Sequence, residues 1–176
     1  MILLLTRPEI QQELQLTPKL ISEAKTLGSE LQRRATALHG QSGPGVLTAR
    51  RVIDEHQTQW LSEHLSPTQL ERLQQLDLQW EGPTACVSRP IIADYLRLSA
   101  EQRASITQLI ANRESIRKQQ GRPAETEEAF ARSILHKLSR PQQEQWNELQ
   151  GRPIRFLADP QPQGPGTAES NAKMQR

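Results

Sequence analysis

The chain has 176 residues, with 22 basic and 20 acidic side chains, and hydrophobic residues make up 35% of it. Only 3% of the residues are aromatic, whereas leucine (23) and glutamine (22) are the commonest types. So few strand-forming residues argue against a β-sandwich or barrel. No buried Val/Ile run precedes a glycine-rich turn, which argues against a doubly wound sheet. The composition therefore favours an all-helical protein.

The net charge, the single cysteine and the distribution of apolar residues exclude several classes of partner and site. The net charge of +2 is too small for a strong electrostatic footprint, which disfavours nucleic acid as a partner. The single cysteine, Cys86, excludes an intramolecular disulfide and a cysteine-rich zinc module. The sequence contains no run of about 18 apolar residues, so no membrane-spanning helix is predicted. The start of the chain has no cation before its short apolar run, so as written it predicts a cytoplasmic protein without an export signal.

Breaks and apolar spacing predict the helices. Glycine- and proline-rich breaks fall at 40–45, 82–83 and 121–123. Between them the apolar residues recur at helical spacing, which predicts about six main helices and two short ones near 7–14 and 89–96. The expected stripes are Leu20, Ala24, Leu27, Leu31, Ala35 and Leu38; Ile53, Trp60 and His64; Leu70, Leu73, Leu76 and Trp80; Ile106, Leu109, Ile110 and Ile116, interrupted by Arg113; Phe130, Ile134, Leu135 and Leu138; and Trp146 and Leu149. Residues 157–176 are rich in Pro, Gly and Gln, which predicts a disordered tail.

The sequence also contains an internal repeat. Residues 6–17 match residues 88–99 at a constant offset of 82, and residues 61–69 match residues 134–142 more loosely at an offset of 73. We therefore predict a tandem duplication of antiparallel helical hairpins. Its units are expected at 1–82 and 83–156.

One short pattern recurs: Leu, then Ser or Thr, two residues, and Gln. In a capping box the hydroxyl accepts from a backbone N–H in the first turn while the Gln side chain accepts from the cap's own N–H, so each copy predicts a helix start. The three full copies begin at Leu65, Leu98 and Leu138, with Ser66, Ser99 and Ser139 as caps and Gln69, Gln102 and Gln142 at the third helical position. A fourth copy, Leu16-Thr17, has Leu20 where Gln is expected.

This pattern resembles the LTxxQ motif of the CpxP/Spy-type bacterial stress proteins. The residue pattern of 4–17 also resembles that of exported proteins of unknown function from planctomycete-like bacteria. The first resemblance implies a small all-helical periplasmic protein that dimerises and holds polypeptides without ATP, provided that the true start lies upstream of Met1. The resemblance covers about residues 4–150.

No residue pattern predicts catalysis, a cofactor or a metal. His56 and His64 are eight residues apart, about 12 Å along a helix, which is too far to chelate one ion. No His neighbours Cys86 in the sequence, and no phosphate-binding or hydrolase motif is present. Four arginines, Arg33, Arg34, Arg50 and Arg51, flank the glycine-rich loop at 40–45. They are either a partner surface for a phosphate or an acidic protein, or solvated helix ends.

We therefore predict a non-enzymatic helical binding protein, chaperone-like in holding polypeptides, that takes no cofactor. The alternative is a helical adaptor or scaffold for one specific protein partner. Candidate contacts are Leu27, Leu31, Trp60, Leu73 and Trp80, although a place in the core is the favoured interpretation of each. Because so few aromatic residues make a thin monomeric core, a homodimer is a further expectation.

Overall fold

The structure is a computed structural model, and it describes residues 1–120 and 124–157. In these residues every regular element is helical, which confirms the all-helical prediction. The α-helices are α1 (Pro8–Glu13), α2 (Pro18–Ala37), α3 (Pro44–His64), α4 (Pro67–Glu81), α5 (Ala85–Ser88), α6 (Pro90–Tyr95), α7 (Ala100–Gln120), α8 (Ala124–Leu135) and α9 (Arg140–Gln150). Two 3₁₀ helices, η1 (Ile2–Thr6) and η2 (Gly82–Thr84), precede α1 and α5. The expected disordered tail lies, apart from Leu157, outside the described residues.

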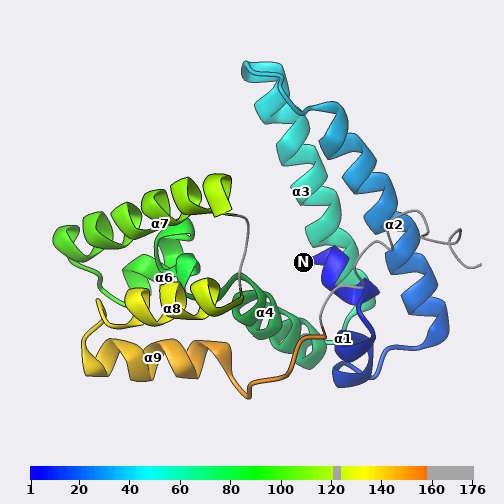
Figure 1. Cartoon of the computed structure of the whole chain (residues 1–176). Coiled ribbons are helices and arrows are strands. Elements are labelled where there is room, and N and C mark those ends of the chain that lie inside the picture. Colours follow the sequence, from blue (N-terminus) through cyan, green and yellow to red (C-terminus); the bar gives the residue numbers. More distant parts are fainter. Residues whose placement is uncertain (121–123, 158–176) are drawn as a thin grey trace, which may run out of the picture.

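The helices form two groups joined by α4 (Figure 1). On one side α2 and α3 form a long antiparallel hairpin, with η1 and α1 at its base. On the other side α6, α7, α8 and α9 pack together, and α9 also contacts α4. None of the helices in the described ranges has both the length and the apolar character that crossing a bilayer requires.

Two clusters of buried side chains form the core, and α4 contributes to both of them. Leu73 and Leu76 of α4 belong to the first cluster, with η1, α1, α2 and α3. Leu78 of the same helix belongs to the second cluster, with α5 to α9. Residues that follow α9 return to the first cluster, where Ile154 and Phe156 pack against it. The two groups of helices are therefore tied together by side chains as well as by the chain itself.

The helix starts lie where the capping pattern predicts them. Ser66 precedes α4: its Oγ accepts from the Gln69 N–H at 3.3 Å, and its N–H donates to Gln69 Oε1 at 3.0 Å. Ser99 makes the same pair of bonds with Gln102, at 3.1 and 3.0 Å. The N–H of Ser139 donates to Gln142 Oε1 at 2.8 Å.

The incomplete fourth copy of the pattern lies before α2. Here the Oγ1 of Thr17 accepts from the N–H of Leu20 at 3.3 Å, so half of the box is present. The leucines that precede all four caps, Leu16, Leu65, Leu98 and Leu138, are buried.

The expected core stripes are wrong at four positions. One of them is Ile116 in α7, which keeps 39% of its surface exposed. Ala35 is exposed because the outer part of α2 extends beyond the packed body of the protein. His64 is exposed at the end of α3, and Trp80 keeps 47% of its surface exposed. Arg113, which interrupts the stripe of α7, lies with its guanidinium 4.4 Å from the ring centroid of Phe130.

The two matching stretches of sequence share unusual backbone geometry. Gln15 and Arg97, 82 residues apart, both have a φ of 51°. The following residues, Leu16 and Leu98, donate their N–H to the carbonyl five residues back, each at 3.0 Å. The tandem duplication itself stays a prediction, which this repeated geometry supports.

Candidate functional site

The base of the α2–α3 hairpin is held rigidly by η1. Gly28 of α2 is buried there, and a methyl group added to it would lie 3.2 Å from Leu3 Cδ2, so η1 packs closely against α2 at this point. Ala24, Leu27 and Leu31 of α2 are buried along the same part of the helix. The inner half of the hairpin is therefore a fixed platform, whereas its outer half extends into solvent (Figure 1).

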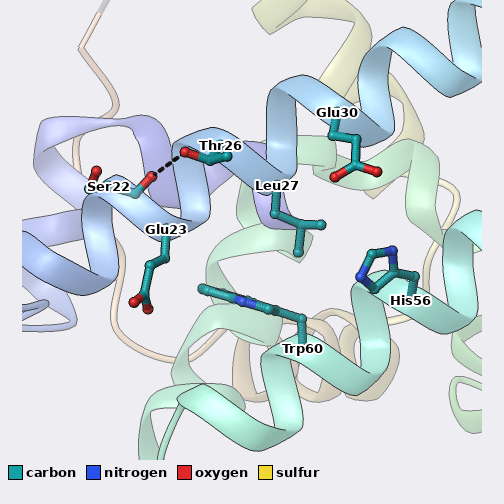
Figure 2. A pocket seen from close by; sticks show the side chains of 7 residues that line it. All are labelled: Ser22, Glu23, Thr26, Leu27, Glu30, His56 and Trp60. Atoms are coloured by element: carbon teal, nitrogen blue, oxygen red, sulfur yellow. Dashed lines mark hydrogen bonds between the residues drawn. The ribbon is translucent and has the colours of Figure 1, made fainter.

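An open groove of about 300 Å³ lies between α2 and α3 on this platform (Figure 2). Leu27 and Trp60 supply its apolar surface, and the carboxylates of Glu23 and Glu30 lie on its α2 side with His56 opposite, on α3. The other lining residues are Ser22 and Thr26, whose Oγ1 donates to the Ser22 carbonyl at 3.1 Å.

The chemistry of this groove suits contact with another chain. The Trp60 ring is stacked on His64, with centroids 4.4 Å apart and planes 12° apart, so it is held in one orientation. Glu23 and Glu30 are paired only along their own helix, with Lys19 at 3.8 Å and with Arg34. An apolar floor beside accessible carboxylates can take up apolar and basic side chains. In the described ranges, no group of three His, Cys, Asp or Glu residues could hold a metal ion.

The four arginines singled out from the sequence lie at the outer end of the same hairpin. Arg33 and Arg34 are in the last turns of α2, and Arg50 and Arg51 are in the second turn of α3 or just beyond it. All four are exposed. Arg51 Nε donates to Glu55 Oε1 at 2.6 Å, and Arg34 pairs with Glu30.

The capping glutamines do more than close their own helices. The Nε2 of Gln69 donates to the carbonyl of Leu14, at the end of α1, at 2.8 Å. The equivalent atom of Gln142 donates to the carbonyl of Leu96, at the end of α6, at 3.0 Å. Gln102 donates to the carbonyl of Lys137 at 2.8 Å and also bonds the side chain of Gln142. These capping residues therefore form part of the scaffold, and the structure brings Gln102 and Gln142 together.

A second groove of about 440 Å³ borders two of the capping residues. Its lining comes from the end of α1 and the start of α4: Glu13, Leu14, Gln15, Ser66, Thr68, Gln69 and Arg72. Glu13 Oε1 accepts from Arg72 Nε at 2.8 Å across this groove. The two charges on its walls thus neutralise one another.

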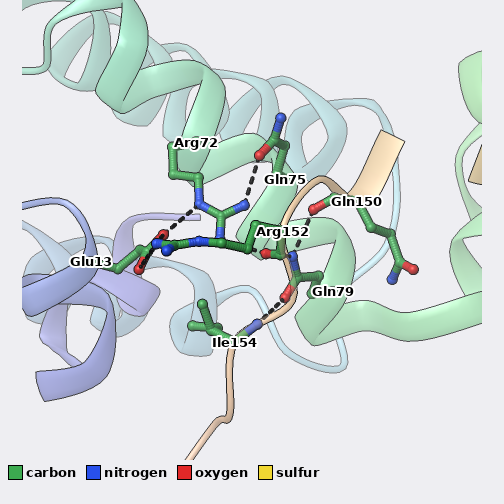
Figure 3. Close-up of polar contacts among 7 residues, drawn as sticks. All are labelled: Glu13, Arg72, Gln75, Gln79, Gln150, Arg152 and Ile154. Atoms are coloured by element: carbon green, nitrogen blue, oxygen red, sulfur yellow. Dashed lines mark hydrogen bonds and ion pairs between the residues drawn. The ribbon is translucent and has the colours of Figure 1, made fainter. Parts of the chain in front are cut away.

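Residues 151–157, here called the C-terminal strap, were not singled out by the sequence. They lie across α1 and α4, held by side chains that bond the backbone of the strap (Figure 3). The carbonyl of Arg152 accepts from Arg72 Nη2 at 2.6 Å, and the N–H of Ile154 donates to Gln79 Oε1 at 3.1 Å. No helical or strand periodicity marks such a segment, so sequence reasoning had no signal for it.

Charged groups of α1 hold the strap as well. Arg152 Nη2 donates to both carboxylate oxygens of Glu13, at 2.8 and 2.9 Å. Hydrogen bonds from Arg152 lower the pKa of Glu13, and those from Arg72 add to this against the opposing effect of burial. Burial raises the pKa of Glu9, but hydrogen bonds from Arg7 and from the N–H of Leu157 are among the contacts that lower it on balance.

The predicted contact residues divide between surface and core. Leu27 and Trp60 line the α2–α3 groove. Leu31 and Leu73 are 4% and 0% exposed, so the favoured interpretation of both as core residues holds. Trp80 is half exposed, but the Arg7 guanidinium lies 4.3 Å from its ring centroid and Phe156 packs edge-on against it.

Cys86 lies in the second core cluster with no exposed surface. Burial, and to a smaller extent the charge of Glu81, raise the pKa of its thiol to about 12. A thiol of this kind remains protonated at neutral pH and lacks the access that a nucleophile needs.

Comparison of the chain with family models, with curated proteins and with solved structures finds no match.

Proposed function

We propose that this chain is a non-enzymatic binding protein that holds polypeptide segments of other proteins. The observation that carries the proposal is the open groove between α2 and α3, which is lined by the partly exposed ring of Trp60, the carboxylates of Glu23 and Glu30, and the edge of the otherwise buried Leu27. Contact of this kind needs an accessible apolar surface with a polar rim, and no reacting group.

The packing of the inner half of the α2–α3 hairpin against the core supports the same proposal. Its inner half is anchored to the core through η1, so a bound segment would meet a preformed surface. A preformed surface loses little conformational entropy on binding. The resemblance to the LTxxQ-type stress proteins points to the same kind of activity, the holding of unfolded polypeptides.

A long side chain placed in the groove provides the test. Thr26 is exposed and lines the groove, so Thr26→Arg should fill it without disturbing the core. Ser29 is exposed on the same helix and does not line the groove, so Ser29→Arg is the matched control with the same added charge. Aggregation of reduced lysozyme, followed by light scattering in the presence of each full-length variant, measures the holding activity.

We expect the parent chain and Ser29→Arg to suppress light scattering equally, and Thr26→Arg to lose most of the effect. Thermal unfolding by circular dichroism checks that both variants are folded. If the parent chain in molar excess leaves aggregation unchanged, holding of unfolded polypeptides is rejected. Equal suppression by both variants would reject the groove as the contact surface.

A further inference from the structure

The outer end of the α2–α3 hairpin carries charge of one sign only. Residues 31–53 contain four arginines and no Asp or Glu. In the structure these residues are the last turns of α2, the connecting loop and the first turns of α3. Because each helical residue rises about 1.5 Å, all four arginines lie within roughly 11 Å of the end of the hairpin, measured along its helices.

The same end exposes aliphatic side chains. Leu47 is 68% exposed and Val52 is 50% exposed, both on the first turns of α3. Large aliphatic side chains beside exposed arginines are typical of surfaces that a partner covers.

The body of the protein does not neutralise these cations. Within the described part of the chain, Arg34 and Arg51 form ion pairs only with Glu30 and Glu55 on their own helices, four residues away. Neither Arg33 nor Arg50 has an ion pair with any residue in the described part of the chain. Exposed pairs within one helix are weak, so all four guanidinium groups remain available to a partner.

We propose that the hairpin end, defined by Arg33, Arg34, Arg50, Arg51, Leu47 and Val52, binds an acidic segment of a partner polypeptide that also carries aliphatic side chains. The inference rests on the proposed polypeptide-binding function and names the chemistry of the partner. Guanidinium groups form paired hydrogen bonds with carboxylates, and the aliphatic groups of the partner would cover Leu47 and Val52.

Other anionic partners fit this surface less well. Residues 31–53 contain no Phe, Tyr or Trp on which unpaired bases could stack. Two exposed aliphatic side chains offer little area for insertion into a lipid surface, which needs an apolar helix face. A carboxylate-bearing polypeptide requires neither feature.

The test measures the binding of a short fluorescein-labelled peptide of Glu and Leu to the full-length protein by fluorescence anisotropy. A peptide with Gln in place of every Glu is the uncharged probe. Arg33→Gln/Arg50→Gln removes two cations from the hairpin end, whereas Arg132→Gln/Arg140→Gln removes two exposed cations from α8 and α9 and is the matched control.

We expect the Glu/Leu peptide to bind and the Gln/Leu peptide to bind much more weakly. The hairpin variant should raise the Kd about fivefold, the effect of losing two exposed ionic contacts, and the control should leave it unchanged. Raising the salt from about 0.05 M to about 0.3 M should weaken binding, because exposed charges are screened. Leu47→Ser/Val52→Ser should also raise the Kd.

Equal binding by the hairpin variant and the control would overturn the proposal. Failure of the peptide to bind, or selective binding of phosphatidylserine vesicles or of a DNA oligonucleotide in its place, would also overturn it. The lysozyme assay separates this result from the proposed function: a parent chain that suppresses aggregation but ignores the acidic peptide holds polypeptides without using the hairpin end.

Discussion

At the scale of single residues, the capping glutamines show what a local pattern can and cannot reveal. The Leu-Ser-x-x-Gln pattern predicts a helix start, and Gln69 Oε1 accepts from the N–H of Ser66 as such a box requires. The same side chain donates through Nε2 to the carbonyl of Leu14, 55 residues away. Glutamate could make the first bond but not the second, so the long-range contact explains the choice of amide over carboxylate. The sequence spacing contains no information about that contact.

We predict that Gln69→Glu destabilises the protein by about 1–2 kcal/mol, because a carboxylate oxygen would face the Leu14 carbonyl with no hydrogen to share. In an ordinary capping box this substitution would be neutral or favourable, since a negative charge suits a helix N-terminus. The free energy of unfolding from urea titration measures the effect. Gln74→Glu, at an exposed position of α4, is the control and should change little. Equal stability of the two variants would show that the bond to Leu14 contributes nothing.

At the scale of elements, helices with strong end signals are predictable and irregular segments are not. The short helices expected near 7–14 and 89–96 correspond to α1 and α6, because proline at the first position and apolar spacing are local signals. The prediction of Ala35 as a core residue is wrong, because helical spacing identifies an apolar face of a helix but not whether another element packs against that face. The strap was missed because its order comes entirely from contacts with distant residues such as Gln79.

Acidification should release part of the stabilisation that the strap provides. The pKa values of Glu9 and Glu13 are lowered in the folded protein from their ordinary value of 4.5. Their contribution is therefore fully present above pH 4.5 and disappears as the pH falls through the lower folded values. We expect Glu9→Gln/Glu13→Gln to lower the Tm at pH 7 by a few degrees, about 1 kcal/mol or more for a chain of this size, and much less at pH 3.

Circular dichroism at the two pH values checks this. Glu101→Gln/Glu144→Gln, at exposed positions of α7 and α9, is the control for removing two carboxylates. A difference in Tm between parent and strap variant that does not shrink at low pH would contradict the assignment of Glu9 and Glu13 as ionised partners of the strap.

At the scale of the whole molecule, the repeated sequence predicts two similar units, but it does not show how they are joined. The positive φ of Gln15 and Arg97 lies at matching positions in the two units. The expected boundary after residue 82 lies within η2, one residue beyond the junction with α4. However, α4 packs into both core clusters, and the strap that follows α9 returns to the first. The sequence similarity predicts the units, but it contains no information about the contacts that α4 and the strap make with the two clusters.

Because α4 serves both clusters, we predict that the two groups of helices unfold together. Leu78 is 4% exposed and belongs to the second cluster, although its helix also packs in the first. Leu78→Ala should cost about 2–4 kcal/mol through lost burial and the cavity left behind. If unfolding is cooperative, amide hydrogen exchange at Ile10 in the first cluster and at Ile106 in the second should accelerate by the same factor.

The exposed residue Leu47 offers the control, since Leu47→Ala should leave both exchange rates nearly unchanged. Faster exchange at Ile106 alone would mean that the second group opens while the first stays folded. In that case α4 would stay packed against η1 and α3 while the helices of the second group separate from it. Equal acceleration of exchange at Ile10 and Ile106 would instead show that the two groups of helices unfold together. The shared helix α4 would then couple the stability of one group to that of the other.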